Sequence, residues 1–232
     1  MNSKLRQLRK REEEEVEKVL RQLSRKVGDE AVGIRKMLQI ITVLDMASAR
    51  ARHGMHLGAV EPRFVGRDQP VSMIGVRHPL LVWQEVDSAM AKARLVRNEE
   101  SEPVSRALEH VVPTNYTLPK SVRCAIITGP NTGGKTVCLK AFSVAALMAR
   151  AGLFVLAEES VEIPFFDVVL ADIGDDQSIT QSLSTFSGHI ERVKRILNSA
   201  TKDSLVVLDE VGSGTDPAEG SALGISLLKQ LK

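Results

Sequence analysis

The first fifty residues of the chain place apolar side chains at the spacing of an α-helix. Apolar positions recur after four and then three residues, with charged residues between them. These positions are Val16, Leu20, Leu23 and Val27, followed after Gly28 by Ile34, Leu38, Ile41 and Leu44. The pattern predicts a long amphipathic helix from about residue 3 to residue 53, interrupted near Gly28 and packed on one or two partners.

From residue 54 to residue 120 this helical period is lost. Prolines divide the stretch into short pieces, at Pro62, Pro70, Pro79, Pro103, Pro113 and Pro119. Two apolar runs between them, residues 71–76 and 79–83, predict short strands. Residues 84–110 are ambiguous, and a charged stretch lies within them at residues 98–102. His78, which precedes one of the prolines, is interpreted as a turn residue.

Residues 121–232 alternate between short apolar runs and longer stretches that favour helix. Val122 to Thr128 predicts a buried strand, and residues 136–150, rich in Ala, Leu and Met, predict a helix. The elements expected after them are strands at 152–156, within 161–173 and at 205–208, a helix opening at 182–189 and running to about 198, and a helix from Pro217 to Leu231. Such alternation is typical of an α/β domain.

Composition limits the class of protein. The chain has 232 residues, 43% of them hydrophobic and 26% charged, which is ordinary for a soluble globular protein. The net charge of +2 is too small to argue for or against nucleic acid. Aromatic residues make up only 3% of the chain, which argues against a single-strand binder that stacks bases on aromatic side chains.

Nothing in the sequence indicates a membrane or an export signal. No apolar run approaches the length of a membrane span, and the N-terminus leads into charged residues rather than an apolar signal core. We therefore expect no membrane partner, and a location in the cytoplasm or in an organelle, plastids included. The sequence does not distinguish between these compartments.

One stretch carries a specific chemical motif. The eight residues from Gly129 to Thr136 fit the pattern G-x-x-x-x-G-K-S/T of the phosphate-binding loop of nucleoside-triphosphate enzymes without a mismatch. Its setting between a predicted strand and a predicted helix is the one that the motif requires. The predicted nucleotide-binding residues are Gly129, Pro130, Asn131, Thr132, Gly133, Gly134, Lys135 and Thr136.

Residue type explains the chemistry of this loop. Glycine lacks Cβ, so the backbone can turn sharply and its N–H groups can close on phosphate oxygens, while the following helix adds its positive dipole end. Lys135 places a charge between the outer phosphates, and the Thr136 hydroxyl is suited to ligate Mg²⁺. The expected ligands are therefore ATP and Mg²⁺.

A second motif stands at residues 205–210. Four apolar residues predict a buried strand, and Asp209 and Glu210 follow at its carboxyl end, where the sites of α/β proteins form. We expect Asp209 to hold Mg²⁺ through its water shell and Glu210 to polarise the water that attacks the γ-phosphate. Paired with the phosphate-binding loop, this motif predicts an ATPase with Lys135 and Glu210 as catalytic residues.

Polar stretches between these motifs allow more than one interpretation. The carboxylate-rich turn from Asp172 to Gln177 fits a metal site about as well as a surface turn. Ser184 or Thr185 is suited to cap the next helix, and hydroxyls at a helix N-terminus can also bind phosphate. His189 lies in the first turns of that helix, and we interpret it as a packing or surface residue.

With these residues in view, the chain resembles the MutS family of DNA-repair ATPases. The resemblance rests on the loop from Gly129 to Thr136 and on Ser184-Thr185-Phe186, Leu208-Asp209-Glu210 and Gly212-Ser213-Gly214-Thr215. Segments 171–178, 182–189 and 214–220 are similar to the paralogue branch called MutS-two rather than to the mismatch-repair branch. The likeness is densest over residues 121–232 and extends more weakly upstream.

The resemblance implies an ABC-type ATPase that works as a homodimer, with two ATP sites at the subunit interface. Ser184 matches the signature serine of the family, which reaches in trans the γ-phosphate bound by the opposite subunit. The family binds branched or mismatched DNA in repair and in the control of recombination. The MutS-two branch also acts on stalled ribosomes, so a ribosome-rescue ATPase is the alternative function.

The resemblance also implies parts for which this chain shows no counterpart. These are the mismatch-reading domain, most of the clamp, the nuclease domain that many MutS-two proteins carry, and the strand that follows the last helix. We therefore expect a truncated chain, with a catalytically incompetent fragment as a further alternative.

Together these patterns predict an α/β fold with an incomplete P-loop ABC-type ATPase sheet, preceded by a long-helix lever segment. We expect three parts along the chain. A helical lever or connector covers 1–55, a mixed strand-and-loop segment over 56–120 begins the ATPase domain, and the P-loop ATPase core covers 121–232. The core is expected to be truncated before its final strand.

Overall fold

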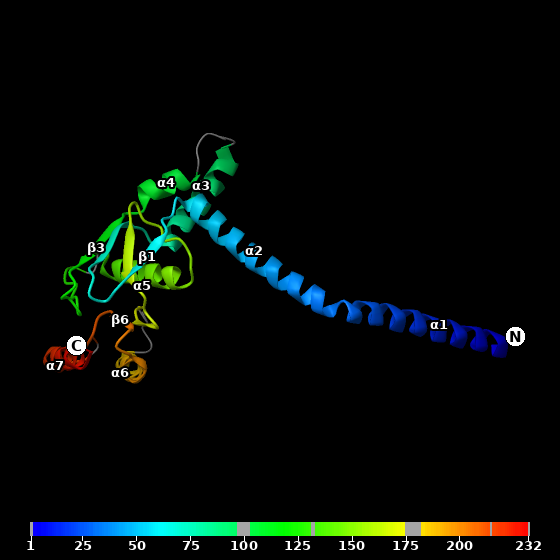
Figure 1. Ribbon diagram of the computed structural model, residues 1–232. Coiled ribbons are helices and arrows are strands. Elements are labelled where there is room, and N and C mark those ends of the chain that lie inside the picture. The colour runs from blue at the N-terminus through cyan, green and yellow to red at the C-terminus, as the bar shows by residue number, and fades with distance from the viewer. Residues whose placement is uncertain (1, 97–102, 131–132, 175–181, 214, 232) are drawn as a thin grey trace. The chain divides into compact units, whose positions relative to one another are not determined.

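The computed structural model describes residues 2–96, 103–130, 133–174, 182–213 and 215–231. Helices and strands are interleaved along the chain (Figure 1). In chain order they are α1 (Asn2–Asp29), α2 (Ala31–Leu57), β1 (Pro62–Val65), β2 (Val71–Val76), α3 (Pro79–Val96), α4 (Pro103–His110), β3 (Thr114–Leu118), α5 (Lys135–Arg150), β4 (Val161–Pro164), β5 (Val169–Asp172), α6 (Ser182–Ser199), β6 (Leu205–Leu208) and α7 (Pro217–Leu231).

The contacts within the chain divide it into two compact units, Met1–Ala49 and Arg50–Lys232. The first unit holds α1 and most of α2, which confirms the predicted helix and its interruption, here at Glu30. Exposed ion pairs such as that between Arg21 and Glu17, at 2.5 Å, run along α1. Because water screens pairs of this kind, they add little to stability.

The apolar stripe of the first unit is exposed. Val16, Leu20, Leu23 and Val27 are 53–60% exposed, although an amphipathic helix normally buries such a stripe against a neighbour. The partner expected for this helix stays a prediction, as does the expected division of the chain at residues 55 and 120.

The second unit contains a four-stranded sheet with the strand order β1-β4-β2-β3. β1 and β4 run parallel, while β2 is antiparallel to both β4 and β3. The helix α5 packs on one face of this sheet, and its small Ala side chains let the two backbones approach closely. Met73, Val76, Val161 and Ile163 are at most 1% exposed in the core between them.

A second core forms where α3 and α4 pack on the end of α2. Its buried residues are Leu57, Val82, Val86, Ala107, Val111 and Leu156. Residues 79–83, predicted as a strand, are the start of α3, so that prediction was wrong. Pro79 fits the first helical position, where no N–H group is needed, and Val82 and Val86 then face one core because they are four residues apart.

His78 stands directly before α3, in the turn where it was expected. Its carbonyl accepts hydrogen bonds from the N–H groups of Leu81 and Val82 at 3.1 and 3.3 Å. Burial lowers the pKa of His78, and the nearby charge of Lys140 lowers it further, so the imidazole favours its neutral form. The residue thus helps to begin a helix.

β5 and β6 form a separate parallel pair, with Asp172 opposite Leu208 at its carboxyl end. The strands predicted within 161–173 and at 205–208 are confirmed, as are the helices α5, α6 and α7. The strand expected at 152–156 is reduced to a single bridge between Val155 and Val60.

Residues 122–128, predicted as the strand before the phosphate-binding loop, are not a strand. No described strand pairs with them, and each is exposed, Ile126 by 70%. A strand needs neighbours that take up its N–H and C=O groups, and without them the segment leaves these groups to water. The described fold is mixed α/β with long N-terminal helices and two small sheets, rather than one continuous ATPase sheet.

Within the described parts of the chain, no helix combines the length and the apolar composition needed to cross a membrane.

We predict that Ile163→Ala and Ile126→Ala differ strongly in their effect on stability. Ile163 is 0% exposed, so its truncation should lower the free energy of unfolding by about 2–5 kcal/mol. Ile126 is 70% exposed, and the same change there should stay within about 0.5 kcal/mol. Urea unfolding followed by circular dichroism measures both values. A loss at Ile126 as large as that at Ile163 would contradict the exposure of residues 122–128.

Candidate functional site

The phosphate-binding loop closes through the backbone of its glycines. Gly134, at the N-cap of α5, has φ 76° and ψ 17°, a left-handed conformation that favours glycine. Gly129, at the start of the loop, has φ 150°. A Cβ atom on either glycine would meet no atom within 4 Å, so the space around them is open. Asn131 and Thr132 lie outside the described residues.

The N-terminus of α5 is suited to an anion. No side-chain cap is described there, so the N–H groups of the first turn and the positive end of the helix dipole face the loop. The Lys135 Nζ atom donates a hydrogen bond to the Gly129 carbonyl at 2.5 Å, which holds the ammonium group at the loop. The Gly133 N–H donates to the Pro130 carbonyl at 3.0 Å. These groups together fit a phosphate.

Tyr116 of β3 fixes the start of α5 to the sheet. Its hydroxyl donates a hydrogen bond to the Cys138 carbonyl at 2.7 Å, and its ring packs edge-to-face on Phe142 with centroids 5.1 Å apart. Burial raises the pKa of Tyr116, and the side chain of Cys138 raises it further, so the phenol stays protonated as a donor. The four-stranded sheet thereby positions the loop that leads into α5.

Thr136 and Asp209 meet although they are 73 positions apart in the sequence. The Thr136 hydroxyl donates a hydrogen bond to Oδ2 of Asp209 at 2.6 Å. Thr136 lies in the first turn of α5, and Asp209 follows directly after β6. The phosphate-binding loop and the carboxylate motif are therefore in contact, through the two residues expected to face Mg²⁺.

The oxygen atoms of this contact are of the kind that Mg²⁺ prefers. A hydroxyl and a carboxylate are hard donors, and Mg²⁺ is usually held by one or two side chains together with water and substrate phosphates. The Thr136 and Asp209 side chains fit that pattern. Among the residues that the structure describes, no group of three or more His, Cys, Asp or Glu side chains is placed to hold a metal ion.

Glu210 has a strained backbone. It is the non-glycine residue with positive φ in the described chain, at 48°. Its N–H donates to Oδ1 of Asp209 at 3.1 Å, and its carbonyl accepts from the Ser213 N–H at 3.0 Å. A conformation of this kind costs roughly 1–3 kcal/mol and persists where the surroundings impose it. The residue is exposed, so its carboxylate is open to water.

Asp172 is buried at the carboxyl end of β5, at 7% exposed. Its Oδ1 accepts a hydrogen bond from Arg192 Nε at 2.6 Å, and its Oδ2 lies 2.8 Å from Nδ1 of His189. Both partners lie on α6, three residues apart and on one face. The backbone carbonyl of Asp172 accepts the N–H of Asp209 at 2.9 Å. The cluster therefore links α6 to the carboxylate motif.

This cluster gives a specific contact to two residues that the sequence left open. The turn from Asp172 to Gln177 fitted a metal site about as well as a surface turn, and Asp172 is 7% exposed; His189, interpreted as a packing or surface residue, makes a partly buried contact with its carboxylate. The signal available in the sequence was a carboxylate that ends a strand, followed by a basic pair at helical spacing, His189 and Arg192. Residues 175–177 of the same turn lie outside the described residues.

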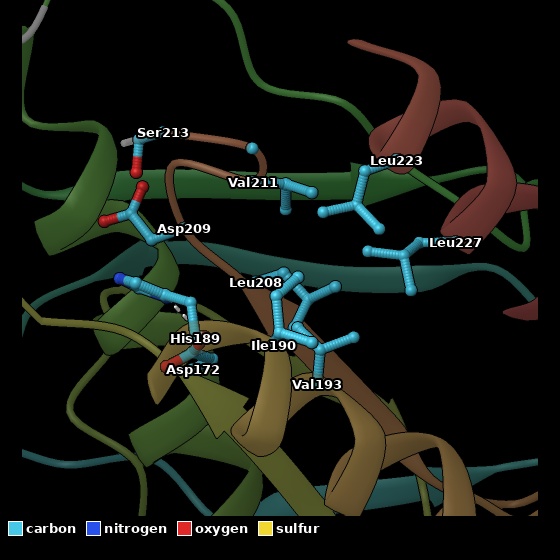
Figure 2. Close-up of a pocket in the computed structure, with 11 residues that line it drawn as sticks. Asp172, His189, Ile190, Val193, Leu208, Asp209, Val211, Ser213, Leu223 and Leu227 are labelled. Carbon is cyan, nitrogen blue, oxygen red and sulfur yellow. Dashed lines mark hydrogen bonds and ion pairs between the residues drawn. The ribbon is translucent and has the colours of Figure 1, made fainter. Parts of the chain in front are cut away.

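A pocket lies between α6, the end of β6 with the turn that follows it, and the middle of α7 (Figure 2). Its polar wall is formed by Asp172, His189, Asp209 and Ser213. The opposite wall is apolar and consists of Ile190, Val193, Leu208, Val211, Leu223 and Leu227. Figure 2 shows the His189 ring between the side chains of Asp172 and Asp209.

Ser184 belongs to the first turn of α6, on the same helix as His189 and Arg192. The structure describes its backbone and not its side chain. Its expected action in trans therefore stays a prediction. Three of the other predicted site residues lie together around the loop: Lys135, Thr136 and Asp209. Glu210 follows directly after Asp209 in the chain.

Two glycines hold the turn after Glu210 against α7. A Cβ atom on Gly212 would lie 2.5 Å from the carbonyl oxygen of Gly220, and a Cβ atom on Gly220 would lie 2.4 Å from that of Gly212. Gly212 also has φ 83°. Side chains at either position would separate the two backbones, so this contact fixes the turn that carries Ser213.

Comparison with known proteins agrees with this geometry. The family model for MutS domain V matches residues 125–232, which include both motifs. The whole chain is 45% identical to the protein named Endonuclease MutS2 of Synechocystis sp., of which it covers 28%. It is 39% identical to the proteins of the same name from Halothermothrix orenii and Clostridium acetobutylicum, covering 26% of each. The chain thus spans about a quarter of the length of these relatives.

Gly220→Ala and Gly224→Ala add the same methyl group to α7 with opposite expected results. At Gly220 the new Cβ would lie 2.4 Å from a backbone oxygen, and we expect a loss of about 1–3 kcal/mol in the free energy of unfolding. At Gly224 the nearest atom would be 3.8 Å away, and Ala should stabilise the helix by up to about 1 kcal/mol. Thermal unfolding compares the two. Equal effects would rule out the close contact between Gly212 and Gly220.

Proposed function

This chain belongs to the MutS family, and from that membership we propose that it binds ATP together with Mg²⁺ and hydrolyses it. The observation that carries the proposal is the 2.6 Å hydrogen bond between the Thr136 hydroxyl and the Asp209 carboxylate. An ATPase needs a loop that holds the phosphates and a strand-end carboxylate at one place. The bond supports that arrangement in this chain.

ATP binds through its phosphates in this proposal. The backbone from Gly129 to Thr136 and the N-terminus of α5 surround the phosphate oxygens. Lys135 exchanges its hydrogen bond with the Gly129 carbonyl for contact with the outer phosphates. Mg²⁺, when bound, supplies positive charge against the β- and γ-phosphates. The Thr136 hydroxyl and the Asp209 carboxylate would hold it, directly or through water.

Glu210 orients the water that attacks the γ-phosphate. Its exposed carboxylate and its position next to Asp209 support this role. The carboxylate accepts a proton from the water as the bond between the γ-phosphorus and the bridging oxygen breaks, leaving ADP and inorganic phosphate. Lys135 stabilises the negative charge that develops on the transferred group.

The active form in this proposal is a homodimer with two shared ATP sites. Ser184 of one subunit contacts the γ-phosphate held by the loop of the other. Its position at the N-terminal turn of α6 suits contact with an anion, since N–H groups and the positive end of the helix dipole accompany its hydroxyl.

For the whole protein we propose ATP hydrolysis coupled to binding of branched or mismatched DNA. The chain covers about a quarter of its relatives, so this part of the proposal rests on the resemblance to the family. The endonuclease activity in the name of those relatives is outside the proposal for these residues.

Glu210→Gln tests the hydrolytic site. The amide keeps the length of the side chain but cannot accept the proton, so we expect hydrolysis to fall by about 10²-fold or more while ATP still binds. Glu219→Gln is the matched control. The Glu219 carboxylate belongs to α7 and accepts a hydrogen bond from the Thr215 hydroxyl at 2.9 Å. Phosphate release and binding of a fluorescent ATP analogue by the full-length protein supply the readouts. Undiminished turnover by Glu210→Gln would remove Glu210 from its role.

Stimulation of hydrolysis tests the coupling to DNA. We expect branched DNA to raise the ATPase rate of the full-length protein. Lys135→Ala should lower the basal ATPase rate by about 10²-fold, and branched DNA should raise the rate of this variant less. Unbranched duplex DNA of the same length is the control, and stalled ribosomes form a separate arm. Stimulation by ribosomes alone would replace the DNA proposal with ribosome rescue.

A further inference from the structure

One buried carboxylate touches both halves of the proposed site. Asp172 is 7% exposed, and its carboxylate is bound by His189 and Arg192 of α6 at 2.8 and 2.6 Å. Its backbone belongs to the β5–β6 ladder, and its carbonyl accepts the N–H of Asp209 at 2.9 Å. Asp172 therefore connects the helix that carries Ser184 to the strand end that carries Asp209.

The polar contacts set a position for α6 that the apolar contacts alone would leave free. Ile190 and Val193 of α6 face Leu208 and Leu227 across the pocket (Figure 2). Apolar packing has no preferred direction, so it permits small shifts of a helix along its axis. Hydrogen bonds to a carboxylate have narrow distance and angle requirements. The axial position of α6 is therefore governed by the contacts to Asp172.

Ser184 lies on the same continuous helix. It precedes His189 by five residues and Arg192 by eight, which correspond to about 7.5 and 12 Å along the axis at 1.5 Å per residue. A displacement of α6 at His189 is therefore passed on to its first turn. Misplacing a contact group by about 1 Å can cost about 10²-fold in rate.

We propose that Asp172, His189 and Arg192 are positioning residues that place Ser184 for the ATP bound by the partner subunit. The inference rests on the proposed function, in which Ser184 acts in trans. Because Asp172 also holds the backbone of Asp209, the cluster couples the carboxylate motif of each subunit to the serine that this subunit offers to its partner.

Mixed dimers of the full-length protein separate this role from a structural one. One subunit carries Glu210→Gln, so that only the other site turns over, and the two subunits are purified through different affinity tags. His189→Ala is placed first in the silent subunit, whose Ser184 serves the working site. It is then placed in the working subunit, which receives Ser184 from an unaltered helix.

The proposal predicts that the location of the change decides its effect. With His189→Ala in the silent subunit, kcat should fall roughly 10-fold or more while KM for ATP stays within about twofold. With the same change in the working subunit, kcat should stay within about twofold. Three outcomes would overturn the inference. These are a loss of kcat only when the working subunit carries the change, equal losses of kcat in the two arrangements, and no loss of kcat in either arrangement.

Conservative variants keep the test decisive if His189→Ala fails to fold. In the silent subunit, His189→Asn retains an N–H donor near the position of Nδ1 and should keep most of the kcat that His189→Ala loses. Arg192→Lys retains the positive charge and should likewise keep most of the kcat of the unaltered protein. Arg195→Ala is the matched control, since this arginine of α6 is exposed and its Nε donates a 3.4 Å hydrogen bond to the Glu191 carbonyl of the same helix. Failure of His189→Asn to restore kcat would contradict a positioning role.

Ser184→Ala in the silent subunit distinguishes the inference from the function on which it rests. If this change leaves the working site unaffected, the shared site itself is wrong. If Ser184→Ala lowers kcat and His189→Ala does not, the shared site stands and the positioning role of the cluster is refuted.

Discussion

The parallel pairing of β5 with β6 is the constraint on which the candidate site depends. It sets Asp172 opposite Leu208 and brings the carboxyl ends of both strands to one edge, so that two acidic residues distant in sequence become neighbours. One of them, Asp209, accepts a hydrogen bond from the hydroxyl of Thr136 in α5. The other, Asp172, contacts two basic side chains of α6, those of His189 and Arg192. A shift of one strand by one residue would turn its side chains to the opposite face of the pair and so separate the two carboxylates.

Two different structures surround this edge: a well-packed sheet on the side of α5, and a strained turn after β6. The Ala-rich face of α5 and the hydroxyl of Tyr116 hold the phosphate-binding loop on a well-packed sheet. The turn beyond β6 is different, because it combines the positive φ of Glu210 with the close approach of Gly212 and Gly220. Local strain of this kind is frequent where a side chain must be presented to a ligand. Its presence next to Asp209 agrees with a site built for chemistry rather than for stability.

The parts of the fold that depend on local sequence were predictable, and those that depend on distant partners were not. The helical period of residues 3–53 and the glycines of the phosphate-binding loop are local signals, and both led to the observed elements. The run at 79–83 was wrongly predicted as a strand because a short apolar run has no period of its own, and Pro79 fits the start of a helix as well as a break.

The prediction of a strand at residues 122–128 was wrong for a different physical reason. Their composition suits a strand, but a strand exists only with neighbours, and no described strand pairs with them. In the site, the motifs identified the loop, Asp209 and Glu210. The helical spacing of His189 and Arg192 indicated a shared face, but their contact with Asp172 did not follow from it, because the contact depends on how α6 returns across the end of β5.

The hydrogen bond between Thr136 and Asp209 also has a consequence for the entropy of the chain. It joins two residues that are 73 positions apart and so closes the segment between them into a loop. Bringing together the ends of a loop of that length reduces chain entropy, by an amount that grows with the logarithm of its length. Here that reduction belongs to the free energy of folding. The contact between α5 and the end of β6 is therefore held against the chain entropy of the whole segment between them, and losing it would release that segment at both ends.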